Sequence, residues 1–191
     1  MSGSTEQFAA PAGGVRRPRA LVLLHWGTLL LIVLTVAAVL LRENIETRDL
    51  RSLLIVLHRS LGLLVGLLVL ARLLVRLRHH PLPPTAEQSA PARLAAGLAH
   101  LALYLLLLAL PLLGWALSNA NGFAVSFCGL FPLPALVAPD EDLGDALAGY
   151  HEDAAWLLLG LVGVHALAAL WHHFVRRDHV LRAMLPLRAG G

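Results

Sequence analysis

Four long apolar runs, separated by segments that contain the polar and charged residues, dominate the chain. They cover residues 20–41, 52–77, 94–117 and 154–175. A helix needs roughly 20 residues, at about 1.5 Å each, to cross a hydrocarbon core of about 30 Å. The pattern therefore predicts four transmembrane helices in one domain over residues 20–185. A disordered tail is expected over residues 1–19 and a short C-terminal tail over 186–191.

The segment between the last two runs, residues 118–150, is also rather apolar but is rich in helix-breaking residues. These are Gly122, Gly129, Pro132, Pro134, Pro139, Gly144 and Gly149. Proline removes a backbone donor and clashes with the preceding helical turn, and glycine favours turns. The segment is predicted to be a long loop on the membrane surface.

Composition supports a membrane protein. Hydrophobic residues make up 58% of the chain and charged residues only 14%, against about a quarter in soluble domains. The basic residues show no aromatic-interleaved surface of the kind that binds nucleic acid, so no nucleic-acid partner is expected. The predicted class is an all-α membrane protein.

The arginines predict the orientation of the bundle. Eleven lie on the side of the two termini: Arg16, Arg17, Arg19, Arg72, Arg76, Arg78, Arg93, Arg176, Arg177, Arg182 and Arg188. Only Arg42, Arg48, Arg51 and Arg59 lie on the other side, together with nine of the twelve acids. Cytoplasmic flanks collect arginine and lysine. Both termini are therefore predicted to be cytoplasmic.

Histidines carry the candidate chemistry. Seven of the ten lie in or at the mouth of a predicted span, and the spans contain no Asp or Glu. A proton-coupled or metal transporter usually pairs its histidines with carboxylates. Neutral imidazoles without carboxylates suit the iron of a buried haem. Bis-histidine haem b is the leading interpretation; a histidine-lined metal transporter and a purely structural bundle are its rivals.

The spacing of His151 and His165 favours two haems. Fourteen residues bring a helix back to within roughly 40° of the same face, and they separate the two side chains by about 21 Å. One helix can thus offer a ligand to each of two stacked haems. Depth in the membrane allows His58 to pair with His151, and His25 to reach toward His165.

Depth alone leaves other histidines open. His100 is as well placed as His25, and His172 shares a face with His165. Their alternative roles are a hydrogen bond to a backbone carbonyl, a haem propionate or a lipid phosphate. Glycines are equally ambiguous: Gly62, Gly66, Gly160 and Gly163 would either leave a flat surface for a porphyrin or permit close helix packing.

Four segments, one from each span, resemble the bacterial cytochrome b561 family. They read LLHWGTLLLIVL, VLHRSLGLLVGLLVLARLLVRL, LAHLALYLLLLALPLLGW and YHEDAAWLLLGLVGVHALAALWHHFVRRDHVLRAML, in the family's order. The resemblance implies a four-helix bundle enclosing two b-type haems. It also implies that His58 and His151 ligate the periplasmic haem iron, and that His25 and His165 ligate the cytoplasmic one. His100 and His172 then become contacts to a propionate or to quinone.

The chain resembles most the superoxide-oxidising members of that family. This implies an inner-membrane protein that takes electrons from superoxide at the periplasmic face and passes them to ubiquinone. The rival is a cytochrome b subunit that relays electrons between a periplasmic redox protein and the quinone pool. Arg59, next to His58, is the candidate residue for steering superoxide or for contacting a propionate.

Other charges near the predicted outer mouth permit two interpretations. Arg42, Arg48 and Arg51 would either help to attract superoxide or balance the acids of their short loop. Six acids of the second outer segment would repel superoxide unless they face away, or would dock a basic redox protein. These are Asp140, Glu141, Asp142, Asp145, Glu152 and Asp153.

Overall fold

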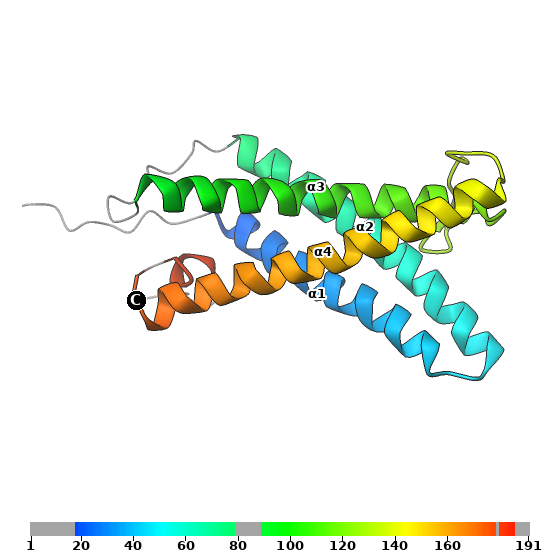
Figure 1. Cartoon of the computed structure of the whole chain (residues 1–191), viewed down its shortest axis with the longest axis horizontal. Coiled ribbons are helices and arrows are strands. Elements are labelled where there is room, and N and C mark those ends of the chain that lie inside the picture. The colour runs from blue at the N-terminus through cyan, green and yellow to red at the C-terminus, as the bar shows by residue number, and fades with distance from the viewer. Residues whose placement is uncertain (1–17, 79–88, 179, 186–191) are drawn as a thin grey trace, which may run out of the picture.

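A computed structural model describes residues 18–78, 89–178 and 180–185, and shows an antiparallel bundle of long helices (Figure 1). The helices are α1 (Arg19–Glu43), α2 (Arg48–Arg78), α3 (Ala90–Ala120) and α4 (Glu141–Phe174). All four are long and apolar enough to cross a membrane. The predicted four-helix membrane bundle is thereby confirmed. The tail predicted over residues 1–19 was one residue too long, because Arg19 begins α1; residues 1–17 and the tail predicted over 186–191 lie outside the described residues.

The two ends of the bundle differ in the helix connections and helix ends that they contain. The α1–α2 and α3–α4 connections lie at the same end of the bundle, apart from each other, and we call this the outer end (Figure 1). Helix α1 begins and α4 ends at the opposite, inner end. The orientation predicted from the arginines would place the outer end in the periplasm.

Packing between the helices is uneven. Helix α1 packs along α2, α2 along α3, and α3 along α4, whereas α4 packs closely against α3 alone among the described helices. The small core lies at mid-depth and includes Ile32, Val69, Leu107 and Leu158. The sides of α4 that face α1 and α2 are therefore left with room for something other than helix.

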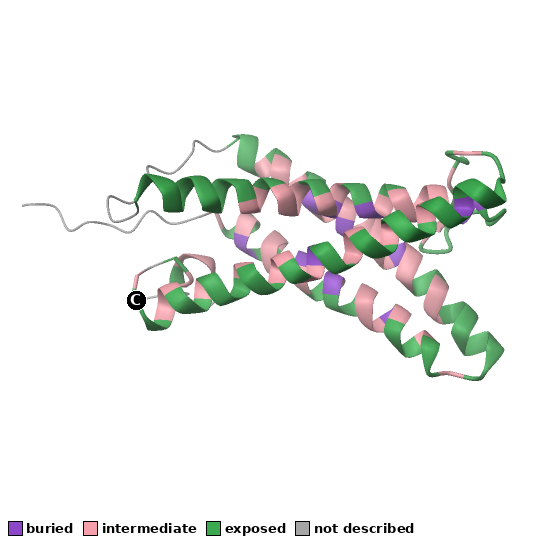
Figure 2. Ribbon diagram, in the orientation of Figure 1, coloured by how far each residue is buried: buried purple, intermediate pink, exposed green. Residues whose placement is uncertain are grey.

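Large apolar side chains cover the outside of the bundle. Leu23, Leu67, Leu105 and Leu167 are each about half exposed or more, on four different helices, and Figure 2 shows exposed residues along the whole length of the bundle. A soluble monomer rarely exposes such continuous apolar surface. This exposed apolar surface is suited to contact with the lipid chains of a membrane.

The loop predicted over residues 118–150 is shorter than expected, and that prediction was wrong at both of its ends. Residues 118–120 belong to α3 and 141–150 to α4. The connection between them contains a minimal hairpin of β1 (Ser126–Phe127) and β2 (Phe131–Pro132).

Capping explains the early start of α4. The Asp140 carboxylate accepts a hydrogen bond from the Leu143 N–H at 2.9 Å, and Glu141 and Asp142 follow in the first turn. A capping carboxylate and acids at a helix N-terminus favour helix. Gly144 allows the start of α4 to pack closely against Asn121, because a Cβ at this position would lie 3.2 Å from Nδ2 of Asn121.

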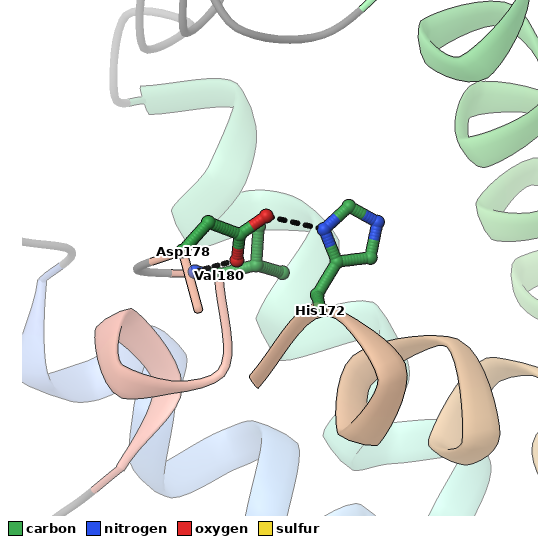
Figure 3. Close-up of polar contacts among 3 residues, drawn as sticks. All are labelled: His172, Asp178 and Val180. Carbon is green, nitrogen blue, oxygen red and sulfur yellow. Dashed lines mark hydrogen bonds and ion pairs between the residues drawn. The ribbon is translucent and has the colours of Figure 1, made fainter. Parts of the chain in front are cut away.

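The C-terminal segment folds back onto the inner end. Its last element is the 3₁₀ helix η1 (Arg182–Met184). Trp26 Nε1–H of α1 donates to the Met184 carbonyl at 2.6 Å. The Asp178 carboxylate contacts Nδ1 of His172 and accepts from the Val180 N–H (Figure 3). These contacts tie the two ends of the described chain together.

Asp178→Asn is expected to loosen this segment in a pH-dependent way. Burial raises the pKa of Asp178, but the hydrogen bonds from His172 and Val180 outweigh it and hold the pKa below the ordinary 3.8. A carboxyl whose pKa is lower in the folded than in the unfolded protein stabilises the fold at every pH above the unfolded pKa. This contribution is lost as the pH falls through the folded pKa. At pH 7 the melting temperature should drop by about 2–4 °C.

Thermal melting in detergent between pH 3 and 7 would measure the effect. The difference from the wild type should be full at pH 7 and should begin to shrink as the pH falls below 3.8 toward the folded pKa. Asp145→Asn, at an exposed acid of the outer end, is the matched control and should leave the melting temperature unchanged. Equal effects of the two substitutions would contradict the assignment.

Candidate functional site

Two histidines from α2 and α4 face each other near the outer end. The ring centroids of His58 and His151 are 6.1 Å apart, and the ring planes are inclined at 75°. The Thr35 carbonyl lies 3.0 Å from Nδ1 of His58. A carbonyl can only accept, so Nδ1 carries the proton and Nε2 has the lone pair that a metal needs. The sequence contained no indication of the role of Thr35.

The partner ring has an unsatisfied nitrogen. Nδ1 of His151 is buried and makes no hydrogen bond within the described part of the chain; the Leu110 carbonyl is nearby but not in hydrogen-bond geometry with it. Buried polar atoms in native proteins are nearly always paired. The Leu110 carbonyl is the acceptor available to Nδ1–H of His151, which leaves Nε2 as the nitrogen available to a metal.

A cavity of about 510 Å³ connects the two outer rings. Its lining is largely apolar and includes His58, Arg59, Gly62, Gly114 and His151. This volume falls within the range of roughly 300–1,000 Å³ that is usual for ligand and cofactor sites. An apolar cavity between two imidazoles, with two arginines at its wall, suits a porphyrin that has carboxylates at one edge.

A second pair of rings lies toward the inner end. His25 of α1 and His165 of α4 have ring centroids 6.1 Å apart, at 73°. His100 of α3 is closer to His165, at 5.3 Å and 79°, and its Nδ1 donates to the Ala96 carbonyl of its own helix at 2.6 Å. His165 therefore has two histidine neighbours.

Ring spacing distinguishes between these neighbours. A metal–imidazole bond is about 2 Å long, and the nitrogen lies about 1 Å from the centre of its ring. Two imidazoles that held one iron from opposite sides would therefore have ring centroids roughly 6 Å apart. The His58–His151 and His25–His165 pairs match this value. The His100–His165 pair is too close for it.

The pattern of helix packing fits the same arrangement. The outer pair joins α2 to α4 and the inner pair joins α1 to α4, which are the helix pairs that pack loosely. Within residues 18–78, 89–178 and 180–185, no three His, Cys, Asp or Glu side chains converge as a multi-ligand metal site requires. The histidines of the bundle are arranged as facing pairs.

The glycines divide between the two expected roles. A Cβ on Gly66 would lie 3.3 Å from Pro111 of α3, so Gly66 permits close packing of the helices. A Cβ on Gly62, Gly160 or Gly163 would meet nothing within 4 Å. Gly62 lines the outer cavity and so keeps part of its wall flat.

Gly114 is a site residue that the sequence did not reveal. It lies in α3 opposite His151, and an added Cβ would be 3.1 Å from Cε1 of that ring. The glycine therefore gives the imidazole its space. No motif marked it, because its importance comes from a contact between two helices far apart in the sequence.

Gly114→Ala is expected to displace the His151 ring by a few tenths of an ångström and to lower the occupancy of the outer site about twofold or more, since packed interiors resist such overlap. Haem b content and the optical spectrum of the purified protein would measure this. Gly97→Ala, in the same helix, is the control because a Cβ there meets nothing within 4 Å. A normal spectrum in Gly114→Ala would refute the role.

Two arginines belong to the outer cavity. The Arg59 guanidinium carbon lies 5.2 Å from the ring centroid of Phe123, in a cation–π contact. Arg42 lines both this cavity and a smaller one of about 230 Å³ formed with Arg48 and Arg51. Nε of Arg42 is buried without a partner among the described residues. The sequence left open whether Arg42 attracts superoxide or balances its acidic neighbours, and it gave no indication of the role of Phe123.

The six outer acids do not line the outer cavity. All six are exposed. Asp140 caps α4, and Glu141 and Asp142 lie in its first turn. Their local role is to stabilise the start of α4, and the wall of the cavity carries arginine.

His172 is directed to a different contact. It interacts with Asp178 of the C-terminal segment (Figure 3). A contact with propionate or quinone remains a prediction for both His172 and His100.

Four apolar helices with facing histidine pairs at two depths define a class of protein: a membrane cytochrome of the b type. The comparisons with known proteins give the family. The family model for prokaryotic cytochrome b561 matches residues 16–187, and the chain belongs to this family. It is a membrane electron-transfer protein of bacterial type, and the family carries b-type haem.

Relatives of known name cover most of the chain. A probable superoxide oxidase CybB of Yersinia pestis is 34% identical over 170 residues, which are 87% of this chain and 94% of the relative. Cytochrome b561 homolog 1 of Escherichia coli K12 is 35% identical over 87% of this chain and 95% of its own length. Cytochrome b561 homolog 2 of the same organism is 38% identical over 68% and 69%.

Proposed function

We propose that the chain is a di-haem superoxide:ubiquinone oxidoreductase of the bacterial inner membrane, with both termini in the cytoplasm. The observation that carries the proposal is the equal 6.1 Å spacing of two histidine pairs. His58 and His151 would hold the outer haem iron, and His25 and His165 the inner one. The name of the Yersinia pestis relative supports the choice of substrate.

The proposed reaction balances over two turnovers. Each superoxide loses one electron at the outer end and leaves as O₂, and two electrons with two protons convert one ubiquinone to ubiquinol at the membrane. Bound haem supplies reversible one-electron chemistry at iron. His151 and His165 set the distance between the two sites, about 21 Å along α4.

The chain's own residues prepare the outer site. Arg59 and Arg42 place positive charge at the wall of the cavity, which raises the local concentration of an anion and its encounter rate. Phe123 holds the Arg59 guanidinium. The Thr35 carbonyl orients the His58 ring and increases its basicity through Nδ1.

Haem content and superoxide reactivity test the proposal together. The detergent-purified protein should contain two haem b per chain in a pyridine haemochrome assay, with a low-spin bis-histidine spectrum. Pulsed superoxide should reduce the haems within the mixing time, and added ubiquinone should reoxidise them. Protein without haem would refute the ligand scheme, and loaded protein that does not react with superoxide would refute the substrate.

A relay subunit is the second candidate, and the exposed acids around the start of α4 favour it. Asp140, Glu141, Asp142 and Asp145 are exposed acids at the start of α4, and exposed acids of this kind attract a basic redox protein. Reduction of the haems by a periplasmic protein that co-purifies with the chain, with no reduction by superoxide, would select this function.

A further inference from the structure

Two arginines of α2 share one aromatic ring of α3 toward the inner end. The guanidinium carbons of Arg72 and Arg76 lie 5.6 and 5.8 Å from the ring centroid of Tyr104. Residues four apart lie on one face of a helix, where like charges repel. The electron-rich face of the ring offsets part of this repulsion. The result is a concentration of positive charge at one place in the bundle.

Arg72 lies at the depth of the inner histidine pair. It follows Arg59 by 13 residues, about 19.5 Å along α2, while His165 follows His151 by 14 residues, about 21 Å along α4. Arg59 lines the outer cavity together with His58 and His151. Tyr104, which Arg72 contacts, lies one turn after His100 in α3, and the His100 ring is 5.3 Å from the His165 ring.

Both histidine pairs are thus accompanied by an arginine that rests on an aromatic ring. Arg59 lies over Phe123 at the outer end, and Arg72 lies over Tyr104 at the inner end. The ring restricts the planar guanidinium before a ligand arrives, so less conformational entropy is lost when it binds. A guanidinium fork matches a carboxylate in a two-point hydrogen bond.

We propose that Arg72, held by Tyr104, binds a propionate carboxylate of the haem between His25 and His165. The inference rests on the proposed function, because it requires that haem. Charged side chains within the bilayer usually mark a functional site, and a guanidinium at the depth of the inner pair is placed to bind a carboxylate there. Arg76 is exposed and lies one turn nearer the inner end.

Haem transfer from the purified holoprotein to an excess of haem-free globin tests the assignment. The wild type should release its two haems in two phases, and His58→Ala, which lacks the outer haem, identifies the inner one. Arg72→Gln should accelerate the inner phase about 10- to 100-fold, the effect of losing a hydrogen bond to a charged group. Arg76→Gln, which removes the other charge on the same ring, should change it less than about threefold.

Two further measurements separate binding from general loosening. Arg72→Gln should lower the midpoint potential of the inner haem alone, because removing a nearby positive charge disfavours the added electron. After reconstitution with haem dimethyl ester, which lacks the carboxylates, the wild type and Arg72→Gln should lose the inner haem equally fast. Tyr104→Leu should accelerate the inner phase about two- to fivefold, and Tyr104→Phe should not.

Several outcomes would overturn the assignment. One is an unchanged rate of inner-haem release in Arg72→Gln. Another is an equal effect of Arg72→Gln and Arg76→Gln, which binding of lipid phosphate would produce. A third is equal acceleration of both release phases by Arg72→Gln. If Arg72→Gln does not fold, Arg72→Lys replaces it, because lysine keeps the charge but cannot make the two-point hydrogen bond of a guanidinium. A wild-type rate of inner-haem release in Arg72→Lys would also refute the assignment. A wild-type protein without haem would refute the proposed function itself, whereas two haems with no effect of Arg72 would refute this inference alone.

Discussion

Replacing His165 with alanine is expected to lower haem b from two per chain to about one. The ring of His165 faces His25 at the spacing that one iron requires. A bis-histidine iron that loses one ligand becomes five-coordinate, and haem in an apolar site is then readily lost. A pyridine haemochrome assay on the purified variant measures the change.

His100→Ala is the matched control for this prediction. His100 is closer to His165 than His25 is, so proximity alone would select it as the ligand. The 5.3 Å spacing between the His100 and His165 rings leaves too little room for iron. The variant should retain two haems. If His100→Ala loses the inner haem and His25→Ala keeps it, the pairing is reversed.

Reversing the charge of Arg59 is expected to slow the reduction of the haems by superoxide about 10- to 100-fold, since fields focused in a cleft accelerate association by such factors. Arg59→Glu would turn the wall of the outer cavity from positive toward neutral, because Arg42 remains there. Stopped-flow spectroscopy at several salt concentrations would measure the rate and its loss of salt dependence.

Haem content must be measured on the same variant, because Arg59 is also positioned to contact a propionate. A slow rate with two haems present supports steering, whereas a slow rate with the outer haem missing supports propionate binding. Arg78→Glu makes the same charge change at the exposed inner end of α2, about 28 Å away along the helix. A comparable loss of rate there would show that net charge, and not the cavity, controls the reaction.

Periodicity and composition were sufficient for the fold but not for every boundary. Apolar runs of more than about 20 residues predict membrane helices because backbone groups in lipid must be satisfied within the segment. The start of α4 was misplaced because Gly144 and Gly149 were interpreted as helix breakers. In the structure the Asp140 cap and the packing of Gly144 against Asn121 keep that turn helical.

The fourteen-residue interval between His151 and His165 is a property of one helix, so the sequence by itself determined that α4 presents two imidazoles on one face at two depths. It also determined the class of protein, because histidine without carboxylate in an apolar span favours haem. Only the tertiary structure decided which rings face them, since His25 and His100 are equally deep and lie at different distances from His165.

The space for the outer ring at Gly114, the restraint of Arg59 by Phe123 and the sharing of Tyr104 by two arginines were also invisible in the sequence. Each depends on contacts between helices, and such contacts follow from how the bundle packs rather than from the spacing of residues along a single helix.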